Sequence, residues 1–279
     1  MDMTDDPQPT AALRLTPQLL HGDEAQLHDP PERILVVGPS LGTSVTALWQ
    51  PTLELMSSET PVIGWDLPGH GIQPASDGPF SLEELADAVE TMVDELAGKH
   101  RWAREAVVDV AGVSVAGVVS LLLALRPNTR FRRVAVLCSA ASIGTADAWH
   151  ERADLVETAG TPTMVAGSAE RWFGPGFMSS HAEIATNLLR SLQYADRHSY
   201  AHVCRALAEV DLRDRLGEAT RPVLAVAGEE DVVCPPADAE LIAAGVPDGQ
   251  SETLAGVAHL APAEAPAAVA RLLEEHLDD

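Results

Sequence analysis

The sequence predicts an α/β fold with a mostly parallel central sheet, helices on both faces and a helical cap insertion. Two observations predict it. Short apolar runs rich in β-branched residues alternate with segments of helical periodicity along most of the chain. That alternation stops between about residues 142 and 210, where helical patterns follow one another without a strand. Strands joined by helices pair in parallel, and such a sheet is covered on both faces.

The expected elements follow from the same patterns in chain order. Strands are expected at residues 33–37, 60–65, 106–111, 133–138, 222–227 and 251–254. Helices are expected between them at residues 45–56, 82–96, 115–125, 237–244 and about 263–276. Ser81 and Glu84 form a capping-box pair at the start of the second helix.

The interruption of the alternation divides the chain into three parts. Residues 1–141 are predicted to form the first part of the α/β core, 142–210 the helical cap and 211–279 the second part of the core. Within the cap, helical patterns cover residues 182–194 and 201–210. We expect the cap to lie over the carboxyl ends of the strands, where open α/β sheets bind their ligands.

Composition and charge exclude several classes of protein. The 279 residues are 46% hydrophobic and 22% charged, and no apolar run reaches the length of a membrane span. The formal net charge of -24 argues against nucleic acid as a partner. It would also repel an anionic substrate, so such a substrate would need a local cation in its pocket. The sequence leaves open whether the chain forms a homo-oligomer.

Cysteine usage and the start of the chain indicate the compartment. The three cysteines are widely spaced and form no CxxC pair, which fits a reducing compartment and gives neither a disulfide framework nor a zinc site. The segment Met1–Pro9 carries three aspartates and no apolar run, unlike a secretory signal. We therefore expect a cytoplasmic protein.

The most informative segment is a predicted strand followed by Gly112-Val113-Ser114-Val115-Ala116 and a predicted helix. A serine on a sharp strand-to-helix turn needs small residues two positions to either side, because the backbone folds back there. Gly112 and Ala116 meet this need, although the second position is more often glycine. Ser114 is therefore predicted to be the nucleophile, on the turn at the end of the strand.

A serine hydroxyl needs a base and an acid, which follow in the chain order Ser, acid, His in proteins with such a turn. The strand at 222–227 leads into a loop with Asp231, and the strand at 251–254 leads into a loop with His259. These two residues are the predicted acid and base. Glu229 or Glu230 remain alternatives for the acid.

An oxyanion hole is expected from two backbone amides. One is that of Val115, the residue after the serine. The other lies in Gly38-Pro39-Ser40-Leu41-Gly42, after the first parallel strand, and is assigned to Leu41 because Pro39 has no N–H. Taken alone, this loop also reads as an ordinary Gly/Pro turn.

Together these motifs resemble the 3-oxoadipate enol-lactonase family of the α/β-hydrolase superfamily, over about residues 33 to 276. The matching segments are 38–43 with Trp49, 66–71, 112–114, 171–173, 204–207, 211–213, 228–231 and 258–260. The serine turn and the three catalytic candidates belong to the whole superfamily. Ser40-Leu41-Gly42-Thr43 and Arg171-Trp172-Phe173 are more particular to the enol-lactonases.

The resemblance implies an α/β-hydrolase fold and hydrolysis of 3-oxoadipate enol-lactone, in the β-ketoadipate route of aromatic catabolism, without metal or organic cofactor. Ser114 would form an acyl-enzyme, with His259 as base and Asp231 orienting it. A carboxylesterase or lactonase of different substrate range is an alternative, and a scaffold that binds a small ligand without turnover is a further one.

The implied substrate is a small anionic lactone, whose carboxylate suits an arginine of the cap. Arg152 and Arg171 are the candidates, although each also reads as a solvated surface charge. Trp149 and Trp172 are candidate pocket residues, while aromatic side chains in a small cap also serve as its core.

Overall fold

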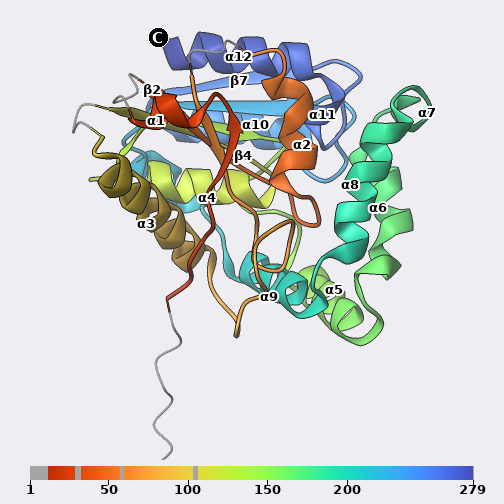
Figure 1. Ribbon diagram of the computed structural model, residues 1–279. Helices are drawn as coiled ribbons and strands as arrows, with labels where there is room; N and C mark the ends of the chain where they lie inside the picture. Colours follow the sequence, from red (N-terminus) through yellow and green to blue (C-terminus); the bar gives the residue numbers. More distant parts are fainter. Residues whose placement is uncertain (1–11, 29–32, 57–59, 103–105, 279) are drawn as a thin grey trace, which may run out of the picture.

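The computed structural model describes residues 12–28, 33–56, 60–102 and 106–278. The acidic segment Met1–Pro9 lies outside these ranges. Seven strands form one sheet in the order β1-β3-β2-β4-β5-β6-β7 (Figure 1). All neighbouring strands pair in parallel except β1, which is antiparallel to β3. The predicted α/β fold class is confirmed.

Six of the seven strands were expected from the sequence. They are β2 Arg33–Gly38, β3 Val62–Gly64, β4 Val107–Val113, β5 Phe131–Leu137, β6 Val223–Gly228 and β7 Gly249–Leu254. The edge strand β1 Gln18–His21 was not expected, nor was the short helix α1 Glu24–His28. All four residues of β1 are half-buried. Such a strand lacks both the alternation and the apolar run by which strands are recognised.

Helices cover both faces of the sheet. The core helices are α2 Val45–Leu53, α3 Leu82–His100, α4 Val115–Ala124, α10 Pro236–Gly245, α11 Ala261–Glu264 and α12 Pro266–Asp278. Figure 1 shows α12 on one face, where it packs against α2, and the adjacent pair α3 and α4 on the other. The capping box at α3 is present, with Ser81 and Glu84 bonding each other's backbone N–H. No helix of the described ranges combines the length and hydropathy needed to cross a bilayer.

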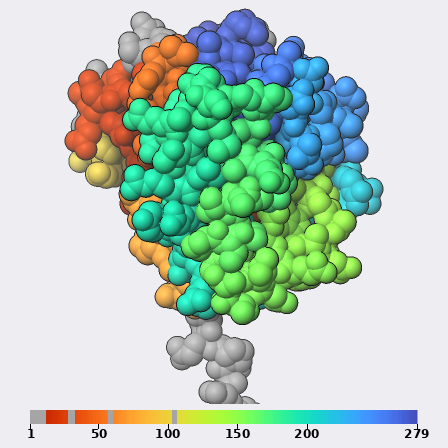
Figure 2. Space-filling model, turned by 90° about the vertical axis from the view of Figure 1, so that its right-hand side faces the viewer, coloured from red at the N-terminus to blue at the C-terminus, as the bar shows by residue number. Residues whose placement is uncertain are grey.

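The segment between β5 and β6 is helical. It comprises α5 Ala146–Ala159, α6 Val165–Trp172, α7 Phe177–Ser180, α8 Ala182–Tyr194 and α9 Arg197–Glu209, with 3-10 turns at Thr161–Met164 and Arg213–Glu218. In Figure 2 the residues of this segment, coloured green to teal, cover the middle of the face turned to the viewer. Of them, the sequence pattern indicated α8 and most of α9. The others are half-polar helices whose burial depends on their neighbours.

Asp109, near the start of β4, is a buried charge with a structural role. Its side chain is fully buried and lies 3.3 Å from Nε of Arg132 and 3.4 Å from Nε of Arg33. It also accepts a 3.0 Å bond from the backbone N–H of Arg133. Burial raises the pKa of Asp109, and the two guanidinium groups oppose that shift. The carboxylate thus ties β2, β4 and β5 together near the amino ends of the strands.

Candidate active site

Ser114 lies on the sharp turn between β4 and α4. Its backbone has φ 55° and ψ -117°, a conformation that side chains with a Cβ rarely adopt. A Cβ at Gly112 would lie 2.1 Å from the carbonyl oxygen of Ala116, so only glycine fits there. A Cβ at Gly38 would lie 2.6 Å from that of Ala116, so this glycine leaves room for the extra methyl group. The small residues expected around the serine are therefore required by backbone contact.

Ser114, His259 and Asp231 form one hydrogen-bonded chain. Nε2 of His259 lies 3.1 Å from Oγ of Ser114, and Nδ1 lies 2.8 Å from Oδ2 of Asp231. All three residues are at most 6% exposed. The carboxylate accepts a hydrogen bond from Nδ1–H, which leaves Nε2 without a proton and able to accept that of the serine hydroxyl. Such a chain can activate the serine as a nucleophile.

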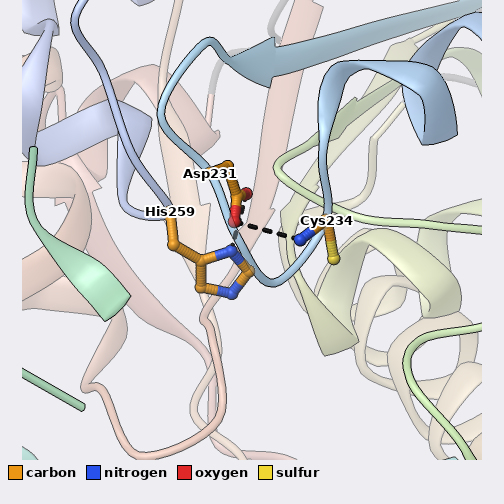
Figure 3. Close-up of side chains that lie close together, drawn as sticks. All are labelled: Asp231, Cys234 and His259. Carbon is orange, nitrogen blue, oxygen red and sulfur yellow. Dashed lines mark hydrogen bonds and ion pairs between the residues drawn. The ribbon is translucent and has the colours of Figure 1, made fainter. Parts of the chain in front are cut away.

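The loop after β6 holds the carboxylate of Asp231 in place. Its Oδ1 accepts bonds from the backbone N–H of Val233 at 2.8 Å and from that of Cys234 at 3.0 Å. Figure 3 shows the second of these bonds and the bond to His259. Glu229 is exposed and bonds the N–H of Gly256, and Glu230 is exposed as well. The structure thus brings Asp231 to His259 and leaves both alternative acids at the surface.

The loop after β2 is a tight turn whose central amide is free. The carbonyl oxygen of Ser40 accepts bonds from the backbone N–H of Thr43 at 3.0 Å and from its hydroxyl at 2.9 Å. Gly42 has φ 87°, which glycine tolerates. Nε1 of Trp49 donates to the carbonyl oxygen of Gly38 at 2.9 Å and fixes the start of the turn. In the described part of the chain the N–H of Leu41 has no acceptor, and neither has that of Val115 at the first position of α4.

A cavity of about 230 Å³ connects this turn with the cap. Ser114, His259 and Leu41 line it from the core side. All four cap residues that the sequence suggested as substrate contacts line it too: Trp149, Arg152, Arg171 and Trp172. A larger surface groove of about 690 Å³ between α2 and α8 includes none of these residues. The smaller cavity is therefore the candidate active site.

Two cap arginines give the cavity a local positive charge. Arg152 lies with its guanidinium 4.8 Å from the centre of the Trp149 ring. Burial lowers the pKa of Arg171, and the like charge of Arg152 lowers it further. In the part of the chain that the structure describes, neither guanidinium forms an ion pair, whereas Arg205 on α9 pairs with Glu157 and Asp154. The two unpaired cations can therefore bind an anion.

Sequence reasoning missed several residues of the cavity wall. Tyr200 and Ser168, both buried, line the cavity beside the arginines, and Val232 and Val233 line it next to Asp231. Burial raises the pKa of Tyr200, so its hydroxyl stays protonated. No motif marks these positions, because they meet only when α6, α9 and the loop after β6 come together.

The cysteine beside the acid does not make a convincing metal site. The side chains of Asp231, Cys234 and His259 lie close together (Figure 3). Their possible ligand atoms are within 4.8 Å of one another. The carboxylate already accepts hydrogen bonds from two backbone N–H groups and from the imidazole Nδ1–H. Burial raises the pKa of the Cys234 thiol well above its usual range, whereas a metal ligand must be a thiolate. The cluster is therefore better suited to proton transfer than to holding a cation.

Comparison with known proteins places the chain in a family. Residues 19–272 match the model of the "Alpha/beta hydrolase family". The chain belongs to this family. Its relatives are named hydrolases and esterases, and this α/β hydrolase is likewise an enzyme that hydrolyses carboxylic esters.

Several relatives of this α/β hydrolase are enol-lactonases. It is 32% identical over 240 residues to 3-oxoadipate enol-lactonase 2 of Acinetobacter baylyi, covering 86% of both chains. It is 31% identical to enol-lactonase 1 of the same organism, covering 83% of this chain and 84% of that protein. The crystal structure of the enol-lactonase from Burkholderia xenovorans LB400 matches with a TM-score of 0.86 at 26% identity, over 97% of this chain and 100% of the other.

A relative with a different name is the pimeloyl-[acyl-carrier protein] methyl ester esterase of Aeromonas hydrophila. It is 29% identical over 225 residues, which cover 76% of this chain and 83% of the esterase. The family thus includes both lactonases and esterases.

Proposed function

We propose that this α/β hydrolase opens the lactone ring of 3-oxoadipate enol-lactone, giving 3-oxoadipate in the β-ketoadipate route of aromatic catabolism. The observation that carries the proposal concerns Arg152 and Arg171. They line the cavity that also contains Ser114, and neither forms an ion pair with a described residue. A protein with a net charge of -24 repels a small acid unless such cations compensate locally. The names of the enol-lactonase relatives support the same substrate.

The acylation step follows from the hydrogen-bonded chain. His259 takes the proton of the Ser114 hydroxyl at Nε2 as Oγ attacks the lactone carbonyl carbon. The amides of Leu41 and Val115 donate to the oxygen that becomes negative. The ring C–O bond then breaks, and the enolate oxygen leaves with the proton from His259. The resulting enol converts to the ketone while the acyl group stays on Ser114.

Deacylation uses the same groups in reverse. His259 takes a proton from water, whose oxygen attacks the acyl carbon in the same oxyanion hole. The C–O bond to Ser114 breaks, and His259 returns the proton to Oγ. Asp231 keeps the imidazole in the required tautomer and stabilises its cation during both steps.

The arginine pair is proposed to hold the carboxylate of the substrate. A guanidinium presents its donors in a planar fork that matches a carboxylate. Trp149 stacks on Arg152 and with Trp172 gives the cavity apolar wall area for the ring. The proposed ligand is thus one small anionic lactone, with neither nucleic acid nor membrane as a partner, and we propose the cytoplasm as the compartment.

A carboxylesterase of different range is the second candidate. It is favoured by the likeness to a methyl ester esterase. In addition, the serine, the histidine and the oxyanion donors can act on an ester carbonyl whatever acyl group carries it. The ratio of kcat/KM for the enol-lactone to kcat/KM for neutral esters separates the two functions.

The test is hydrolysis of 3-oxoadipate enol-lactone, generated in situ from muconolactone. We expect rapid turnover by the wild type and a loss of about a thousandfold or more in kcat for Ser114→Ala. Ser179→Ala, at an exposed serine of the cap, is the matched control. An inactive wild type that still reacts at Ser114 with a fluorophosphonate would refute the lactone as substrate and favour the esterase.

The role of the arginines has its own test. Arg152→Gln and Arg171→Gln are each expected to lower kcat/KM for the lactone by about 10- to 100-fold, because a hydrogen bond between charged groups is lost. Neither should lower kcat/KM for a neutral acetyl ester by more than about twofold. Arg197→Gln, at an exposed arginine of the cap, removes the same charge outside the cavity and should change neither. Equal losses for both substrates would refute carboxylate binding.

A further inference from the structure

The carboxylate of Glu264, at the end of α11, accepts three backbone hydrogen bonds. Oε1 accepts from the N–H of Ala258 at 3.2 Å and of Leu260 at 3.1 Å, the two residues that flank His259. Oε2 accepts from the N–H of Gly174 at 2.6 Å, which belongs to the cap. One half-buried side chain therefore binds the backbone on both sides of His259 and the backbone of the cap.

The cap meets the histidine loop closely at this point. The backbone N–H of His259 donates to the carbonyl oxygen of Trp172 at 3.2 Å. A Cβ at Gly174 would lie 2.6 Å from the carbonyl oxygen of Gly256, so the two backbones are in direct contact. Trp172 also lines the cavity above Ser114. The position of the imidazole and the position of the cavity roof thus depend on the same few hydrogen bonds.

Glu264 also lies near enough to His259 for the charges of the two side chains to interact. Burial raises the pKa of Glu264, while its three N–H partners and His259 oppose that shift. The other titratable groups around His259 are Asp231 on the loop after β6 and the neutral thiols of Cys138 and Cys234. Across the cavity stand the two arginines of the cap. Glu264 and Asp231 are therefore the acidic groups that face His259 among the described residues.

We propose that Glu264 is a positioning residue that fixes His259 against Ser114 and couples the cap to the histidine loop. This inference rests on the proposed roles of Ser114 as nucleophile and His259 as base, and it is independent of the lactone as substrate. The carboxylate acts in two ways. It holds the backbone on both sides of His259, and its charge favours the imidazolium that forms when the base takes a proton.

Two substitutions separate these actions. Glu264→Gln keeps the size of the side chain but removes the charge and turns one acceptor into an N–H donor that faces a backbone N–H. Glu264→Asp keeps the charge but is one methylene too short to reach all three donors. Glu240→Gln removes the same charge from an exposed position on α10 and is the matched control.

The readout is acylation of Ser114, which needs no particular acyl group. We measure the rate of labelling by a fluorophosphonate and the acylation rate with p-nitrophenyl acetate against pH. Both Glu264 variants are expected to acylate about 10- to 100-fold more slowly, because a misplaced base loses catalytic alignment. In Glu264→Gln the acid limb of the pH profile should also differ from that of the wild type, because this variant has lost the negative charge near the base. In Glu264→Asp the limb should stay near that of the wild type.

The possible outcomes are distinct. The inference is supported if both variants acylate slowly and the acid limb is shifted only in Glu264→Gln. Slow acylation with the same limb in both variants would assign Glu264 a purely structural role and overturn it, and so would acylation within twofold of the wild type. If Glu264→Gln does not fold by near-UV circular dichroism, Glu264→Asp decides by its acylation rate. A wild type that labels at Ser114 but leaves the lactone intact would refute the proposed substrate and leave the inference standing.

Discussion

Replacing Ser114 with glycine should yield a more stable protein than replacing it with alanine, because the backbone at this position is strained. Ser114 has φ 55° and ψ -117°, outside the ordinary left-handed helical region. Any residue with a Cβ pays for this conformation, and the cost is about 3 kcal/mol at the upper end of the usual range. Both substitutions remove the hydroxyl and its bond to His259, so that loss cancels in the comparison.

The magnitude follows from three opposing contributions. Glycine relieves about 3 kcal/mol of strain but loses about 0.7 kcal/mol to the greater entropy of the unfolded chain. It also gives up burial of one methyl group, about 0.8 kcal/mol at this nearly inaccessible position. About 1.5 kcal/mol remains in favour of glycine. For a chain of 279 residues this corresponds to a Tm about 2.5 °C higher.

Thermal unfolding of the two variants, followed by circular dichroism and calorimetry, measures the difference. The same pair of substitutions at Ser179, in α7 and without a positive φ, is the control. There glycine should be the less stable variant by about 0.5 to 1 kcal/mol. If Ser114→Gly melts at or below Ser114→Ala, the nucleophile turn stores no backbone strain and the reasoning fails.

Three further predictions follow from the described contacts. Asp231→Asn should lower kcat by on the order of 10⁴ with little change in Tm, because an amide can present its N–H to Nδ1 and favour the wrong imidazole tautomer; a loss below about tenfold in steady-state kinetics would contradict this. Asp109→Asn should destabilise the fold by about 3 kcal/mol in urea unfolding, because it leaves two arginines without their buried partner. The exposed ion pair of Asp94 with Arg130 should contribute less than about 1 kcal/mol to the free energy of unfolding, so equal costs for Asp94→Asn and Asp109→Asn would refute the argument. All three cysteines are buried, and burial raises the pKa of Cys204 to about 12 and those of the other two as well, so at pH 8 they should react with a disulfide reagent only after unfolding; rapid reaction of the native protein would disprove their burial.

Local sequence patterns predict most strands and helices of the core, and they place Ser114, His259 and the candidate acids at 229–231 in the turns and loops after strands. The reason is that local periodicity reveals the strand before each of them: Ser114 comes directly after β4, Asp231 three residues after β6 and His259 five residues after β7. In a parallel sheet the carboxyl ends of the strands share one edge, so residues that follow different strands meet there. The glycine at 112 could be read in the same way, since its requirement arises within one turn.

Which acid serves the histidine, and which residues surround the cavity, depends on how the elements pack. Asp231, Glu229 and Glu230 are all acids in the same loop, so the sequence alone does not separate them. The course of the loop after β6 brings Asp231 to His259 and leaves the two glutamates exposed. In the sequence the two arginines are indistinguishable from surface charges. In the structure α5 and α6 direct them into the cavity, where neither forms an ion pair with a described residue. Glu264 carries no local signal, because its three donors come from the loop after β7 and from the cap. Local patterns encode the backbone of each element, whereas partners distant in the chain are selected when the elements pack.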